Sequence, residues 1–144
     1  MKTLLLMIGL SLFSLSSHAE NLCETSFENE VAPISKAMEE RTDPNRWKKY
    51  ETFLKKFGPC LDASYAETVQ DISEKGLAHD WDRFAHYVQS QKPDPKILRS
   101  NIETGFDLEL GTHENLLQIQ KNAKTNCPKK LKHFCAEILK AKIP

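Results

Sequence analysis

The stretch that decides the fold is DPNRWKKYETFLKKFGP, residues 43–59. Asp43 and Pro44 predict a helix start, because aspartate caps free N–H groups and proline suits the first helical position. Gly58 and Pro59 predict its end. Between them, apolar side chains recur every three or four residues and so share one helix face: Trp47, Tyr50, Leu54 and Phe57.

The same spacing predicts a helix before this stretch and two after it. The first runs to about Arg41, with Pro33 in its first turn or at a kink, and its apolar face carries Phe27, Val31, Ile34 and Met38. A third helix is predicted over residues 64–74, ending at Gly76, with Tyr65, Val69 and Ile72 inside. A fourth, over residues 80–90, buries Trp81, Phe84 and Val88.

Three more helices are predicted in the C-terminal half. Asp94 and Pro95 start a fifth, which ends at Gly105 and is followed by a connection over residues 106–111. Thr112 caps a sixth, and Pro128 begins a seventh. Their apolar faces carry Leu98 and Ile102; Leu116, Ile119 and Ala123; and Leu131, Phe134, Cys135, Ile138 and Leu139.

No segment alternates as a β-strand does, so the chain is predicted to be all-α, with about seven short antiparallel helices in one domain. Three sets of residues recur at intervals of 33 to 35: Trp47, Trp81 and Leu116; Pro59, Pro93 and Pro128; Tyr65, Leu98 and Leu131. Periods of this length are typical of helical-hairpin repeats. A solenoid-like array and a compact bundle with a chance repeat both remain open.

Residues 1–19 have the features of a secretory signal peptide. Lys2 precedes the apolar run from Leu4 to Leu15, and small residues precede a cleavage site after Ala19. The run of about 12 residues is shorter than the roughly 20 that span a bilayer. We therefore expect a soluble product, residues 20–144, in the periplasm or outside the cell, without stable membrane insertion.

All four cysteines lie after the predicted leader: Cys23, Cys60, Cys127 and Cys135. An even number in an exported chain favours two disulfides. An antiparallel pairing of the first two helices brings Cys23 and Cys60 to one end, which leaves Cys127 for Cys135. Eight residues of continuous helix span roughly 12 Å, too far for a disulfide. The second bridge therefore requires the last helix to start near Lys130.

Charge is distributed unevenly along a nearly neutral chain. Cleavage removes one of 20 basic residues and none of 20 acidic ones, which leaves a net charge of −1. Residues 121–142 hold seven lysines and one acid, and this basic end is a candidate surface for a protein or an anionic envelope component through Lys129, Lys130 and Lys132. Nucleic-acid binding is disfavoured, because aromatic residues are not interleaved with these lysines.

Two further groups of residues are candidate sites. Phe53 and Tyr87 lie off the strict apolar faces at equivalent positions 34 residues apart, and would help to line a partner groove if one exists. His79, Asp82 and His86 are spaced to share one face of the fourth helix and are weak candidates for a metal site. A solvated helix face is the alternative. No cofactor is predicted.

Signatures of catalysis are lacking in the sequence. It has no Gly-x-Ser-x-Gly elbow, no glycine-rich phosphate loop, and no metal or haem spacing of cysteine and histidine. The sequence therefore favours a binding protein over an enzyme, such as an inhibitor, an immunity protein or an envelope accessory protein. A small envelope hydrolase, or a carrier of metal or small ligands that uses the fourth helix, remains the alternative.

Overall fold

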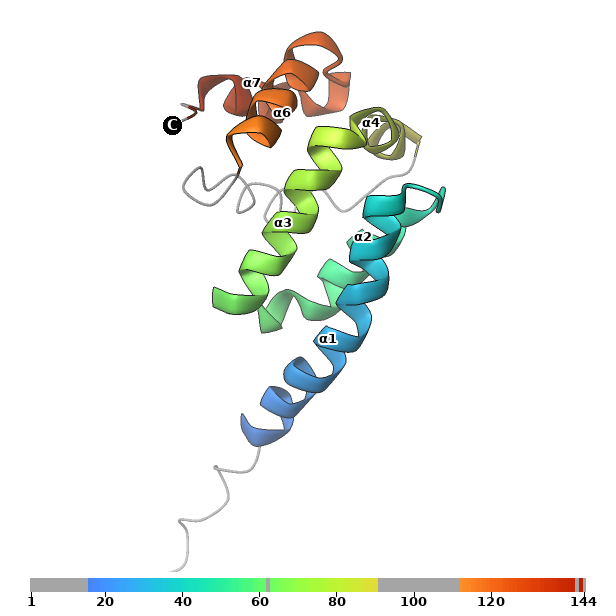
Figure 1. The fold of residues 1–144 in the computed structure, drawn as a ribbon, viewed down its shortest axis with the longest axis vertical. Coiled ribbons are helices and arrows are strands. Elements are labelled where there is room, and N and C mark those ends of the chain that lie inside the picture. Colours follow the sequence, from blue (N-terminus) through green and yellow to red (C-terminus); the bar gives the residue numbers. More distant parts are fainter. Residues whose placement is uncertain (1–15, 62, 91–111, 142, 144) are drawn as a thin grey trace, which may run out of the picture.

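The computed structural model describes residues 16–61, 63–90, 112–141 and 143, and all regular elements in this part of the chain are helices, with no strand (Figure 1). The all-α prediction is confirmed, and the expected number of about seven helices is close. The predicted fifth helix and the connection after it lie outside the described residues. The helices are α1 (Ser16–Glu40), α2 (Arg46–Phe57), α3 (Ala63–His79), α4 (Trp81–Ser90), α6 (His113–Thr125) and α7 (Lys132–Lys140), with 3₁₀ turns η1 (Gly58–Cys60) and η2 (Lys129–Leu131).

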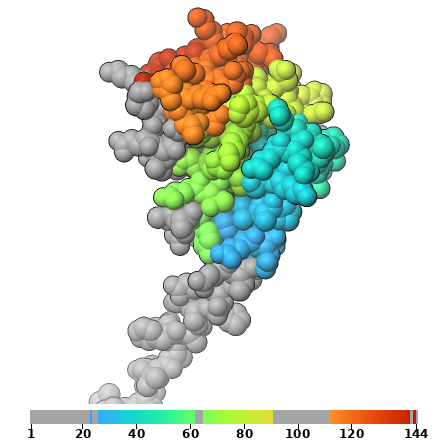
Figure 2. Space-filling view, in the orientation of Figure 1, coloured from blue at the N-terminus to red at the C-terminus, as the bar shows by residue number. Residues whose placement is uncertain are grey.

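Helix α3 is the centre of the arrangement. It contacts α1, α4 and α6, while α1 also packs on α2 and α6 on α7. Figure 1 shows α6 and α7 beside the end of α3 from which α4 leaves, and the space-filling view shows α1 and α2 along one side of the molecule (Figure 2). Units of a solenoid contact only their neighbours. Because α3 meets α6, two units further along the suggested repeat, the arrangement is a compact bundle.

The core follows the predicted apolar faces. Each described helix contributes buried side chains at the predicted positions, among them Phe27, Trp47, Tyr50, Ile72, Trp81, Phe84, Leu116, Ile119 and Ile138. Leu139 was also expected inside but is 46% exposed. The short helix α7 buries only Cys135 and Ile138, and the side chain after Ile138 points about 100° away around the helix. Among the described helices, none has the length and apolar character needed to cross a membrane.

Both disulfides join the cysteines that the hairpin argument pairs. Cys23 bonds to Cys60 with 5.5 Å between Cα atoms, and Cys127 bonds to Cys135 with 6.2 Å. The last helix starts at Lys132, so Cys127 lies in the preceding loop as the second bridge requires. The first bridge fastens the N-terminal half of α1 to the turn after α2.

The predicted end of the third helix at Gly76 is wrong, because α3 continues to His79. A Cβ atom built at Gly76 would lie 2.5 Å from Met38 Cε and 3.0 Å from Trp47 Cη2. Glycine at this position therefore allows α1 and α2 to approach α3 closely, and it does not end the helix. Of the two places expected for Pro33, the first turn is wrong, because Pro33 lies in the interior of α1.

The start of α2 lies two residues later than predicted. Asp43 accepts a hydrogen bond from the backbone N–H of Asn45 at 2.8 Å, so the Asp-Pro pair forms a turn that leads into the helix at Arg46. Thr112, by contrast, caps α6 as predicted, and its side chain accepts from the N–H of Asn115.

A buried ion pair joins the start of α2 to the start of α4. The guanidinium of Arg46 donates two hydrogen bonds to the Asp80 carboxylate, and Trp47 Nε1 donates a third at 2.8 Å. The side chains of Arg46 and Asp80 are only 4% and 9% exposed. Arg46 also donates to the carbonyls of Arg41 and Asp43, which closes the α1–α2 turn around the same guanidinium.

We expect Asp80→Ala to lower the free energy of unfolding by about 3–5 kcal/mol, because it leaves a buried guanidinium and an indole N–H without their acceptor. Glu30→Ala is the matched control: it breaks the exposed pair with Lys56 and should cost about 1 kcal/mol or less. Urea unfolding of the disulfide-bonded chain, followed by circular dichroism, measures both. Equal losses in the two variants would contradict the central role of Asp80.

Gly76→Val should destabilise the fold by about 1–3 kcal/mol, because its branched side chain would overlap Met38 and the Trp47 ring. Glu67→Val places the same side chain at an exposed position of the same helix and should alter stability by no more than about 0.5 kcal/mol. Thermal unfolding compares the two variants. A Gly76→Val protein as stable as the control would show that close helix approach is unimportant.

Candidate binding site

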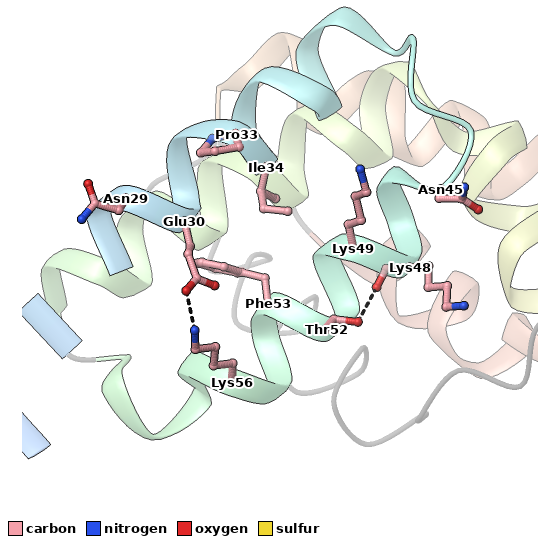
Figure 3. A pocket seen from close by; sticks show the side chains of 10 residues that line it. All are labelled: Asn29, Glu30, Pro33, Ile34, Asn45, Lys48, Lys49, Thr52, Phe53 and Lys56. Carbon is pink, nitrogen blue, oxygen red and sulfur yellow. Dashed lines mark hydrogen bonds and ion pairs between the residues drawn. The ribbon is translucent and has the colours of Figure 1, made fainter. Parts of the chain in front are cut away.

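A cleft of about 570 Å³ lies between α1 and α2, and we call it the α1–α2 cleft (Figure 3). Its wall on α1 consists of Asn29, Glu30, Pro33 and Ile34, and its wall on α2 and the turn before it consists of Asn45, Lys48, Lys49, Thr52, Phe53 and Lys56. On each helix these residues recur about one turn apart, so each set forms a continuous face.

The base of this cleft is apolar. Ile34 is half-buried, and Phe53, only 3% exposed, extends from α2 toward α1 (Figure 3). The Phe53 ring packs against Phe27 and Phe57, with centroids 5.2 and 4.9 Å away. This aromatic contact holds the Phe53 ring in place, so the base is a preformed surface.

The rim of the cleft is cationic. Lys48, Lys49 and Lys56 all come from α2, and Glu30 is the only acidic residue among the described residues that line the cleft. Lys56 pairs with Glu30 across the space between the helices (Figure 3). Lys48 has no ion-pair partner within the described part of the chain. The cleft thus combines an apolar base with a lysine rim, in which Lys48 is the lysine without an ion-pair partner in the described residues.

Asp43 holds Lys49, one of the three rim lysines, in place. The Lys49 ammonium lies 2.6 Å from the Asp43 carboxylate and lowers the pKa of that group, assisted by the hydrogen bond from the N–H of Asn45. A lowered pKa in the folded state stabilises the fold above the ordinary carboxyl pKa, and the effect is lost as the pH falls through the lowered value. At neutral pH Asp43 is therefore ionised and orients Lys49.

The two aromatic candidates for a partner groove lie on different clefts. Phe53 lines the α1–α2 cleft, whereas Tyr87 lines a second cleft of about 170 Å³ between α2 and α4. The Tyr87 hydroxyl donates to the buried carboxylate of Glu51, and desolvation together with that carboxylate raises the pKa of Tyr87. The two clefts share Asn45 and Lys48, so they are neighbours on the same side of α2.

The predicted lysine surface at the C-terminal end lies away from the lining of both clefts. Lys129 and Lys132 are exposed in η2 and at the start of α7. Lys130 instead donates to the carbonyls of Val88 and Gln89 at the end of α4. Its ammonium therefore stabilises unpaired carbonyls at a helix C-terminus, while Lys129 and Lys132 remain a candidate surface.

The predicted histidine face does not form. His79 is the last residue of α3, whereas Asp82 and His86 belong to α4. The His79 ring bonds to Asn115, and Asp82 accepts from Asn126. Residues 16–61, 63–90 and 112–141 contain no group of three or more histidine, cysteine or acidic side chains placed to hold a metal ion.

Two buried carboxylates connect helices. Glu74 accepts hydrogen bonds from the backbone and hydroxyl of Thr112 and from the Asn115 amide, which joins α3 to α6. Glu51 accepts from Tyr87 and pairs with Lys55 at 3.0 Å. Both carboxylates are less than 7% exposed, and their hydrogen bonds serve the packing of helices.

Sequence reasoning missed the α1–α2 cleft, although its residues were visible. Lys48, Lys49 and Lys56 recur on the polar face of the most securely predicted helix, but a lysine face is usually only solvated. The contact between α1 and α2 places Ile34 and Phe53 beside these lysines. Comparisons with protein-family models, curated proteins and solved structures found no match to the chain.

Proposed function

We propose that this chain is an exported binding protein that recognises another protein through the α1–α2 cleft. The observation that carries the proposal is the cleft itself, where a held aromatic ring and a half-buried isoleucine lie beneath three lysines. Its volume is about 570 Å³.

Export is supported by two independent features. The leader-like residues 1–19 predict secretion, and the two disulfides suggest an oxidising, non-cytoplasmic environment. Cleavage after Ala19 would place the new N-terminus near Cys23, and the bridge to Cys60 would then hold the first turn of α1 on the domain.

The chemistry of the cleft selects the kind of partner segment. Apolar side chains of a partner would cover Pro33 and Ile34 above the buried Phe53 ring. A carboxylate beside them would meet Lys48, which has no ion-pair partner in the described part of the chain. A groove between two helices with an apolar base suits an amphipathic segment. We therefore propose an acidic amphipathic segment of an envelope or secreted protein as the ligand.

The product isolated from its natural source should have lost residues 1–19 and should carry no free thiol. Intact-mass measurement before and after alkylation, without reduction, checks both points. Reduction should add four alkylation sites, since the described structure contains two disulfides and no free cysteine. An intact Met1 together with four alkylated cysteines in the unreduced product would refute export.

Two variants test the cleft: Ile34→Glu and the double variant Lys48→Glu/Lys49→Glu. Each should weaken capture of the partner from an envelope extract by at least about tenfold, because one places a charge on the apolar base and the other reverses the rim. Quantitative mass spectrometry of the captured proteins gives the readout, with circular dichroism to confirm folding.

Lys129→Glu/Lys132→Glu is the matched control, since it makes the same charge change on the C-terminal lysine surface. It should retain the partner that the cleft variants lose. If the partner is lost only in this control variant, the C-terminal lysine surface is the binding site, and the role of the cleft is refuted. Finding no protein whose capture depends on either surface would refute the proposed function.

A further inference from the structure

The smaller cleft between α2 and α4, which we call the α2–α4 cleft, brings together cationic side chains from two helices. It has a volume of about 170 Å³ and is lined by Lys48 from α2 and by Arg83 and His86 from α4. The rings of Trp47 and Tyr87, 1% and 8% exposed, also line it. Two packed aromatic residues thus give the cleft a rigid base.

Among the described residues that line this cleft, none is acidic. The side chains of Lys48, Arg83 and His86 have no hydrogen-bond or ion-pair partner among the residues that the structure describes. The two hydroxyls nearby are already engaged, because Tyr87 donates to Glu51 and Ser90 donates to the carbonyl of His86 at 2.7 Å. The groups left to bind a ligand are therefore the cationic and imidazole side chains.

The acidic residues of the two helices are not among the described residues that line the cleft, although Glu51 contacts the lining residue Tyr87. Glu51 is the only acidic residue of α2, and its carboxylate is held by Tyr87 and Lys55. Asp82 is the only acidic residue of α4, and it accepts from the Asn126 amide at 2.6 Å. Within the described residues, neither carboxylate forms an ion pair with Lys48, Arg83 or His86.

We infer that the α2–α4 cleft binds a phosphate-class oxyanion, either free phosphate or the phosphate of a monoester. A guanidinium presents paired donors that match two oxygens of such an anion, and an ammonium adds a point charge. A concave site lined by one sign of charge concentrates ions of the opposite sign. Because Arg83 and His86 lie outside the lining of the α1–α2 cleft, this inference does not depend on the proposed protein partner.

Titration of the disulfide-bonded mature protein with inorganic phosphate tests the inference. Ionic strength is kept constant with chloride, and proton–nitrogen NMR follows the backbone of residues 45–48 and 83–90 and the Arg83 side chain. We expect saturable shifts confined to these groups. Arg83→Gln should weaken phosphate binding about tenfold, the effect of losing one charged hydrogen bond.

Lys121→Gln provides the matched control, because it removes an exposed cation from α6 and should leave phosphate affinity unchanged. Lys48→Gln should weaken both phosphate and the protein partner, whereas Arg83→Gln should weaken phosphate alone. Shifts that spread over many lysines without saturation, or a phosphate affinity that is unchanged in Arg83→Gln, would overturn the site. Phosphate binding and protein capture through the α1–α2 cleft are measured separately, so the failure of one does not imply the failure of the other.

Glycerol phosphate in place of inorganic phosphate distinguishes the two sources of the anion. Tighter binding of glycerol phosphate at the same residues would assign the site to monoesters, and tighter binding of inorganic phosphate would assign it to the free ion. Failure of both anions to shift the Arg83 side chain would overturn the inference.

Discussion

The Asp80 carboxylate is the contact on which the arrangement of the N-terminal helices depends. It accepts from Arg46 and Trp47, while Arg46 also binds carbonyls of the α1–α2 turn and Arg41 donates to the carbonyl of His79. Four helix ends therefore meet around one buried ion pair. Breaking such a pair is costly because a charge is then left in a medium of low polarity. Since α2 forms a wall of both clefts, the position of each cleft depends on this contact.

Helix α3 connects the N-terminal helices to the C-terminal half through hydrogen bonds. Tyr50 donates to the Val69 carbonyl and also bonds to Ser73, Glu74 binds the capping residue of α6, and the Asn122 amide donates to the carbonyls of Leu77 and Ala78. Within the described residues, no fully buried side-chain nitrogen or oxygen lacks a hydrogen-bond partner. Apolar packing alone would tolerate sliding of one helix along another, whereas these directional contacts fix the register.

Net charge is a poor guide to the surface of this protein. The predicted mature chain is nearly neutral, yet α2 carries five basic residues and one acid along a single helix. One of the five, Arg46, is neutralised in the core, and Lys48 lies where the two clefts meet. Contacts with α1 and α4 add an apolar base on one side of Lys48 and further cationic groups on the other, so one helix face supports two kinds of binding chemistry.

Local patterns in the sequence determined the helical class, the core face of each described helix, the cap at Thr112 and, with one geometric assumption, both disulfides. These features depend on residues a few positions apart or on the direction of paired helices. Both can be read from the spacing of apolar residues and helix ends along the sequence. The tertiary structure decided the remaining features. These are the interior place of Gly76, the exposure of Leu139, the separation of His79 from Asp82 and His86, and the two clefts. Each of these features depends on which helices pack against each other. The contacts that stabilise this packing join residues far apart in the chain, and a pattern that repeats every few residues does not specify them.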